Sequence, residues 1–214
     1  MSKIYETDQI IHCHACLLDN NDTFRISFVY GSNDDRERRA LWENMCANLS
    51  AGTPWIVLGD FNVARGVQDT IGGSSRRSAA MDEFEDCLQA AELDDLRFSG
   101  FFHTWCNKRS NDDCISKKLD RVLVNYAWLG KSTNSEAIFL SPSISDHSPS
   151  LVKLGLQGRK KNCPFKFFNF LTEREDFLPL VKSCWQEKVH GTMQFKLCSK
   201  LRILKKALKS LNKN

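Results

Sequence analysis

The stretch that decides the fold is Trp55-Ile56-Val57-Leu58-Gly59-Asp60-Phe61-Asn62. Its first four residues are all apolar, which is typical of a short strand that is buried on both faces of a sheet. Asp60 and Asn62 follow two positions apart, so their side chains can face the same side where the strand ends. A carboxylate and an amide at one strand end indicate either a functional site or an ordinary turn, and the rest of the chain decides between them.

Strand and helix patterns alternate on both sides of this stretch. Residues 9–18 and 24–30 have strand composition and are separated by turn-forming residues 19–22, which indicates a hairpin. Apolar residues at helical spacing predict helices over residues 36–49 and 80–93. Further strands are expected over residues 98–105, 118–125, 137–140 and 151–154. The mixture predicts an α+β fold with a core dominated by strands.

The charge of the chain changes sign towards its end. Residues 153–214 contain 15 Lys and Arg against 4 Asp and Glu, a balance of +11, which leaves −7 for residues 1–152. We therefore predict an acidic domain over residues 9–156, followed by a basic aromatic linker and helical extension over residues 157–214. A basic segment of this density is typical of contact with polyanions or a membrane surface, although solvated helix faces give the same pattern.

The cysteines and the hydropathy of the sequence indicate the cellular compartment to expect. The 9 cysteines follow no repeating spacing, and no apolar signal segment begins the chain, which favours an intracellular location, nuclear or cytoplasmic. No apolar run approaches the roughly 18 to 20 residues that span a bilayer, so no membrane partner is expected. His12-Cys13-His14-Ala15-Cys16 has the spacing of half a zinc site. No second pair matches it, and alternate side chains of a strand point to opposite faces, so zinc is not expected.

Two further motifs carry groups that suit phosphodiester hydrolysis, which needs a divalent metal, a base and donors for the developing charge. Ser145-Asp146-His147-Ser148-Pro149 places a carboxylate beside an imidazole, the natural base near neutral pH. Asp120 places a charge within an apolar strand, and pairing with His147 would satisfy it and orient the ring. The alternatives are a solvated turn at the first motif and a surface pairing of Asp120 with Lys118 or Arg121.

With Tyr30 ahead of them, the three motifs in this order resemble the endonuclease/exonuclease/phosphatase family, which includes abasic-site endonucleases and pancreatic-type deoxyribonucleases. Phe102-His103-Thr104-Trp105-Cys106-Asn107 and the aromatic residues 164–170 look like the plant LINE-type retrotransposon branch of that family. The resemblance covers nearly the whole chain from about Ile11 onward. It implies a DNase-I-like fold, a two-layer β-sandwich flanked by helices, with a helical C-terminal extension.

The resemblance also implies a role for each matching residue. Tyr30 and Asn62 would contact the scissile phosphate. Asp60 would position or activate the attacking water near a Mg²⁺ or Mn²⁺ ion. His147, held by Asp120, would act as a base or as a donor to the phosphate.

Other matched positions would lie around this centre. Asp146 would be a carboxylate on the metal side. Thr104, Trp105 and Ser145 would face the DNA. For Trp105 a buried core position is the alternative, because Trp in strands is commonly buried.

One part of the family pattern is not matched. The first strands of the family carry an asparagine and then a glutamate that is a principal metal ligand, and neither motif is present. Glu6 precedes the first hairpin with no apolar strand around it, so the role is not assigned to Glu6. The domain is therefore expected to lack its N-terminal strands, to expose strand edges, to hold its cation weakly and to have little or no activity.

Three functions remain open at this point. The first is metal-dependent hydrolysis of DNA phosphodiesters by a retrotransposon-type endonuclease. The second is an inactive remnant of a retroelement polyprotein, in which the basic tail contacts DNA, RNA or a following reverse-transcriptase domain. The third is hydrolysis of a phosphoinositide or phospholipid head group, against which the Thr104-Trp105 pair and the tail argue.

Overall fold

The computed structural model of the chain describes residues 1–17, 22–49, 52–73, 76–109, 113–132, 134–155, 167 and 169–211. It divides into two compact units, Met1–Cys163 and Pro164–Asn214. No described helix is long and apolar enough to cross a membrane. The expected turn at residues 19–21, the boundary stretch at 157–161 and most of the aromatic stretch at 164–170 lie outside the described residues.

The largest sheet of the first unit has six strands. They are β1 (Ser2–Glu6), β2 (Ile10–Cys16), β3 (Thr23–Tyr30), β4 (Trp55–Asp60), β6 (Asp94–Asp95) and β10 (Asp120–Val124). Their order is β1-β2-β3-β4-β10-β6, with β3 and β4 parallel and the other pairs antiparallel. The β2–β3 hairpin predicted from the sequence is present. The strand β1 was not expected, and all five of its residues are exposed.

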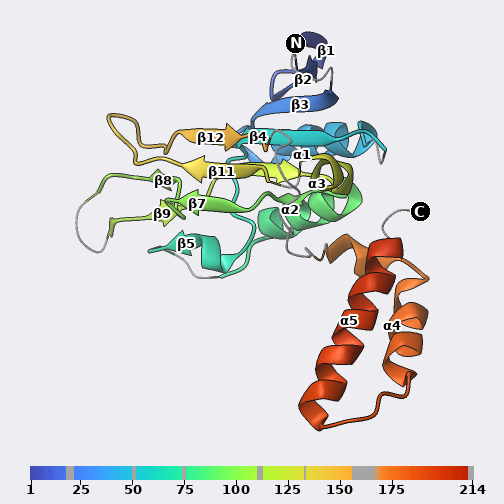
Figure 1. Ribbon diagram of the computed structural model, residues 1–214. Helices are drawn as coiled ribbons and strands as arrows, with labels where there is room; N and C mark the ends of the chain where they lie inside the picture. The colour runs from blue at the N-terminus through green and yellow to red at the C-terminus, as the bar shows by residue number, and fades with distance from the viewer. Residues whose placement is uncertain are drawn as a thin grey trace. The chain divides into compact units, whose positions relative to one another are not determined.

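The central strand β4 is buried on both faces, as its apolar sequence predicts. Trp55 and Val57 are fully buried in a core cluster beneath the helices α1 (Asp35–Ala47) and α2 (Ala79–Ala90). Figure 1 shows both helices on one side of this sheet. Ile56 points the other way, into a second cluster.

That second cluster lies between two sheets. The second sheet consists of β7 (Phe98–Gly100), β11 (Glu136–Phe139) and β12 (Ser150–Lys153), in the order β12-β11-β7. Val122 and Val124 of β10 pack there with Phe139 of β11. The first unit is therefore a two-layer β-sandwich with helices on its outer face, and the predicted α+β class is confirmed.

Two predicted strands are wrong in extent. The expected strand over 98–105 is split into β7 and β8 (Trp105–Cys106), and that over 118–125 begins only at Asp120. Gly100 breaks the first, because its φ of +90° bends the backbone where a Cβ would meet the carbonyl oxygen of Phe139. β8 instead joins β5 (Thr70–Ile71) and β9 (Ser116–Lys117) in a third small sheet, and a short helix α3 (Tyr126–Lys131) follows β10.

The second unit is helical, as expected. It contains a 3₁₀ turn (Asn169–Glu173) and the helices α4 (Phe177–Gln186) and α5 (Met193–Leu211), which lie side by side (Figure 1). The leucines of α5 form one stripe, of which Leu208 and Leu211 are buried. Leu197 and Leu201 on the same stripe stay about half exposed.

Candidate metal-binding site

The pairing of three strands brings chemically active side chains into one row. Asp60 ends β4 and faces Asp120, the first residue of β10, as its register partner. On its other side Asp60 is the register partner of Tyr30, which ends β3. Because side chains alternate along a strand, Asp60 and Asp120 share the face on which Ile56 and Val122 pack against the second sheet. These strand-end residues therefore lie at one edge of the sandwich, at the opening between its two sheets, which we call the mouth.

His147 completes a cluster at this mouth. Its Nδ1 lies 2.9 Å from Asp120 Oδ2, and its Nε2 lies 3.8 Å from Asp60 Oδ2. One potential ligand atom from each residue lies within 4.8 Å of the other two, and no other such group occurs in the described part of the chain. Two carboxylates and an imidazole are ligands that a divalent cation accepts. The donor set thus fits a cation, although it supplies fewer oxygens than Mg²⁺ or Mn²⁺ requires.

The backbone around β8 holds His147 in place. Trp105 and His147 form an antiparallel bridge. On either side, Ser148 N donates to Thr104 O at 2.7 Å and Cys106 N donates to Asp146 O at 3.1 Å. These bonds fix the loop that carries the imidazole against a strand of the third sheet.

Exposed Ser145 belongs to the same loop. Its Oγ accepts the backbone N–H of His147 at 3.1 Å, a short-range turn contact. The structure therefore gives Ser145 a part in shaping the loop, and a contact with DNA remains a proposal.

Burial and the charges of the cluster shift the pKa values of Asp60 and His147. Burial raises the pKa of Asp60, and the nearby charge of Asp120 raises it further. The hydrogen bond from the backbone of Asn62 lowers this pKa, but the two raising effects together are larger. For His147, burial alone would lower the pKa, but the hydrogen bond and charge of Asp120 and the charge of Asp60 outweigh it and raise the pKa. The carboxylates that raise these two pKa values create a region of negative potential, which favours a cation.

Asn62 shapes the turn that follows β4. Its backbone is left-handed with φ 51°, a conformation that Asn tolerates better than most residues. Its N–H donates to Asp60 Oδ1 at 2.9 Å, and its Nδ2 donates to Gly31 O at 2.7 Å. The backbone of Asn62 therefore orients Asp60, and its side chain ties the ends of β3 and β4 together.

Two predicted residues lie at the surface around the cluster. Tyr30 is 68% exposed at the end of β3, so its hydroxyl is accessible to a ligand. Asp146 is exposed and accepts a hydrogen bond from Trp105 Nε1 at 3.0 Å, which lowers the pKa of Asp146. Among the described residues Asp146 is not part of the metal-ligand group. Trp105 itself is half-buried, between the two positions considered for it.

The structure corrects the position of Thr104. Its side chain is 1% exposed, so it does not lie on a DNA-facing rim. Its Oγ1 accepts the backbone N–H groups of Leu119 at 3.1 Å and Asp120 at 2.9 Å. Thr104 thus lies beneath the cluster and positions Asp120, a role that its place before Trp105 in the sequence did not indicate.

Lys118 and Arg121, the alternative partners considered for Asp120, both interact with other residues. Lys118 is 2% exposed and places its amino group 3.5 Å from the ring centroid of Phe98, so it does not pair with Asp120. Arg121 points to the opposite face of β10 and pairs with Asp69 and Asp95. Both ring nitrogens of His12 bond to other side chains, Nδ1 to Ser27 Oγ at 2.7 Å and Nε2 to Asn44 Oδ1 at 2.8 Å.

A pocket of about 320 Å³ lies beside the cluster. Its lining includes Phe101, Phe102 and Trp105, and Asp146 contributes to the same wall. Ser148 is 3% exposed in this lining, and its Oγ has no hydrogen-bond partner among the described residues. Aromatic surface combined with an unsatisfied hydroxyl suits a flat, polar ligand.

The comparisons with known proteins show similarity only in fold. No family model and no curated protein matches the chain. The Xenopus laevis APE2 catalytic domain is 12% identical with a TM-score of 0.49, over 72% of this chain and 57% of that one. An endonuclease/exonuclease/phosphatase from Bacteroides vulgatus is 17% identical with a TM-score of 0.42, over 68% and 55%.

Staphylococcus aureus beta toxin is 12% identical with a TM-score of 0.47, over 68% of this chain and 57% of the toxin. The chain thus spans little more than half the length of each of these three structures. TM-scores below 0.5 are too low for these likenesses to decide the function.

Proposed function

We propose that the first unit hydrolyses phosphodiester bonds of DNA with the help of a divalent cation, Mg²⁺ or Mn²⁺, as an endonuclease of the retrotransposon type. The observation that carries the proposal is the cluster of Asp60, Asp120 and His147 at the mouth of the sandwich. The motif order that resembles the endonuclease/exonuclease/phosphatase family supports it independently of the geometry.

Each residue of the cluster has a chemical task in this proposal. Asp60 holds the cation or the attacking water. His147 takes the proton of that water through Nε2, and Asp120 at Nδ1 stabilises the imidazolium that results. A bound cation supplies positive charge against the charge that develops on the phosphate. Exposed Tyr30 donates its hydroxyl to a phosphate oxygen.

The small number of protein ligands predicts a weakly held cation. Mg²⁺ prefers about six oxygen ligands, of which this cluster supplies only part. Water and the substrate phosphate must provide the rest, so we expect occupancy to depend on substrate and activity to be low.

Two features favour a nucleic acid as the substrate. Beside the cluster lies the pocket with aromatic walls, a surface on which a base can stack. The second unit carries 11 Lys and Arg against 4 Asp and Glu, and such a basic segment contacts phosphates.

Nicking of supercoiled plasmid at low salt tests the proposal. The full chain should nick with Mg²⁺ or Mn²⁺ and not with EDTA. His147→Ala and Asp60→Asn should each reduce the rate by about 10²-fold or more, because each removes a group that acts on the water. The matched control is Asp82→Asn, a surface carboxylate paired with Arg77, which should leave the rate unchanged. Nicking that survives both cluster variants would locate the activity elsewhere.

A non-catalytic nucleic-acid-binding protein is the second candidate, because the basic second unit does not require the cluster. In that case DNA affinity should fall steeply with salt, and Asp60→Ala should leave the affinity unchanged. Salt-dependent binding without any cation-dependent nicking by the folded full chain would favour this candidate over hydrolysis.

A further inference from the structure

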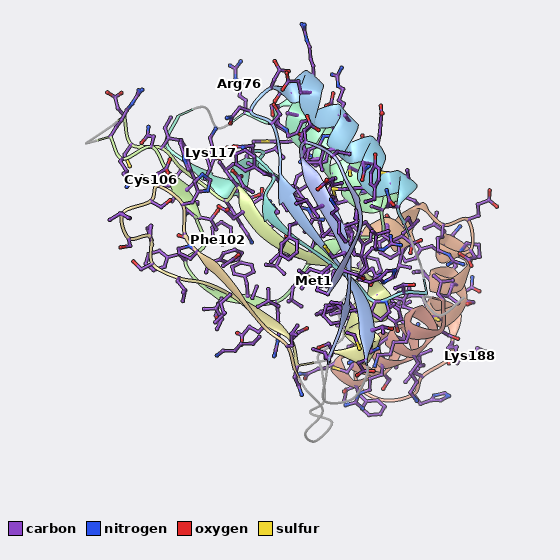
Figure 2. The ribbon with its side chains drawn as sticks, turned by 90° about the horizontal axis from the view of Figure 1, so that it is seen from above. Met1, Arg76, Phe102, Cys106, Lys117 and Lys188 are labelled. Carbon is purple, nitrogen blue, oxygen red and sulfur yellow. The ribbon has the colours of Figure 1, made fainter. Side chains whose placement is uncertain are left out.

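Two cysteines meet in the hairpin of the third sheet. Cys106 lies in β8, and Cys114 lies two residues before β9, whose Ser116 is the register partner of Cys106. The two Sγ atoms are 3.8 Å apart, and both side chains are half-buried rather than enclosed. Figure 2 shows Cys106 at one end of the first unit, on the same side as Phe102 and Lys117. A small oxidant therefore has access to a pair of thiols in van der Waals contact.

The two thiols differ in their surroundings. The backbone N–H of Lys108 donates to Cys106 Sγ at 3.4 Å, and this bond lowers the pKa of Cys106. The neighbouring Cys106 raises the pKa of Cys114. Because the thiolate is the reactive form, Cys106 is the nucleophile of the pair and Cys114 the resolving thiol.

We propose that Cys106 and Cys114 are a redox modification site that forms a reversible disulfide when the protein meets a peroxide. The Cys106 thiolate attacks one peroxide oxygen, and the O–O bond breaks. Cys106 is thereby oxidised to a sulfenic acid, and the departing hydroxide takes a proton to become water. The Cys114 sulfur then attacks the sulfenic sulfur and releases its own proton, and the hydroxyl group leaves as a second water. For hydrogen peroxide, two thiols give one disulfide and two waters.

The required movement is small. A disulfide has an S–S distance of about 2.0 Å, so the sulfurs must approach by a little under 2 Å. Rotation of the two side chains supplies displacements of this size without changing the pairing of β8 with β9.

The bond would act on the loop that holds His147. The Cys106 N–H donates to Asp146 O, and the adjacent Trp105 bridges His147. A covalent link at Cys106 therefore braces the strand against which the SDH loop, residues 145–147, is fixed. Closing so short a loop should raise the Tm of the first unit by roughly 5 to 10 °C.

The test is peptide mapping of the full, folded chain under non-reducing conditions after treatment with hydrogen peroxide. We expect two of the 9 thiols to disappear, one linked peptide pair containing Cys106 and Cys114, and full reversal by dithiothreitol. Cys114→Ser should leave a sulfenic acid on Cys106 that a dimedone probe labels. The matched control Cys16→Ser removes an exposed thiol outside the pair and should leave the linked pair intact.

Other outcomes would overturn the proposal. One is oxidation of Cys106 to sulfinic acid with no linked peptide in the unsubstituted chain. Another is linkage that is scattered equally over other cysteines. Neither readout depends on nuclease activity, so the disulfide can fail while the proposed hydrolysis stands, and the reverse also holds.

Discussion

At the scale of single residues, Asp120 connects the imidazole of His147 to the central sheet. Its carboxylate bonds to Nδ1 of the ring, and its own backbone N–H is held by the hydroxyl of Thr104. The ring is thus positioned by Asp120, whose backbone is held in turn by the buried side chain of Thr104. Such support matters because a base that is misplaced by a fraction of an ångström loses much of its effect.

Replacing the carboxylate should change the titration of the ring. In Asp120→Asn, without metal and with EDTA present, the pKa of His147 should fall, because the hydrogen bond and charge that raise it are gone. In the wild type the raised pKa contributes stability that is complete below pH 6.5 and is lost as the pH rises through the folded-state pKa. NMR titration of the imidazole protons measures the pKa of His147 in the wild type and in the variant, with His190 as internal control. An unchanged His147 titration in the variant would contradict the coupling.

Thr104 offers a second residue-scale test. Thr104→Val leaves the N–H groups of Leu119 and Asp120 without their acceptor, which should cost about 1–3 kcal/mol of unfolding free energy. Thr104→Ser keeps the oxygen and should retain most of the stability. Urea unfolding of the two variants compares them directly, and a loss that is confined to Thr104→Ser would mean that the methyl group, not the hydroxyl, is what matters.

At the scale of elements, the parallel pairing of β3 with β4 fixes the row that contains Asp60. Gly59 permits this pairing, because a Cβ at its φ of +142° would lie 2.0 Å from Val29 O. Any side chain there must push the two strands apart beside the cluster.

Gly59→Ala should therefore destabilise the first unit by about 2 kcal/mol or more, given both the strained φ and the clash. The matched control is Gly130→Ala, where a Cβ meets nothing within 4 Å inside α3 and should stabilise by about 0.5–1 kcal/mol. Thermal unfolding of both variants measures the two changes in stability. Similar effects at the two glycines would contradict the close approach.

The sequence predicted some elements well and others poorly, for physical reasons. β4 and the helices α1 and α2 carry strong local signals, an unbroken apolar run and apolar residues at helical spacing. β1 has no apolar face, and α3 depends on a cap in which the side chain of Asn125 accepts the N–H of Trp128. The small third sheet is held by partners distant in sequence, which periodicity cannot reveal.

The candidate site was partly predictable in the same way. Asp60 and Asp120 stand out as charges at apolar strands, and the Asp120–His147 contact expected from that pattern is present. The burial of Thr104 and the turning of Asp146 towards Trp105 depend on how β8 meets the SDH loop. That tertiary contact has no signature in the local sequence.

At the scale of the whole first unit, a network of buried charges joins its separate parts. Arg121 of β10 pairs with Asp69 in the loop after Asn62, and Asp69 Oδ2 also accepts the N–H groups of Arg65 and Gly66. Arg65 continues the network to Glu85 of α2 at 2.5 Å. The network anchors the loop that leaves the candidate site.

Arg121→Leu should cost about 3–5 kcal/mol, because it leaves the buried carboxylate of Asp69 without its cation. Arg39→Leu is the matched control, since its pair with Glu83 is exposed to solvent and should contribute little to stability. Urea denaturation of both variants checks the difference. A loss in Arg121→Leu no larger than in the control would show that the network does not hold the unit together.

The most direct test of the proposed cation site is a Mn²⁺ titration followed by paramagnetic broadening of the histidine NMR signals. Binding at the cluster predicts that the His147 signal broadens at lower Mn²⁺ concentration than those of His12 and His190. The selectivity should disappear in Asp60→Asn and persist in Asp82→Asn. Equal broadening of all three signals, or selectivity unaffected by Asp60→Asn, would contradict a cation site at the cluster and with it the hydrolysis proposed for this chain.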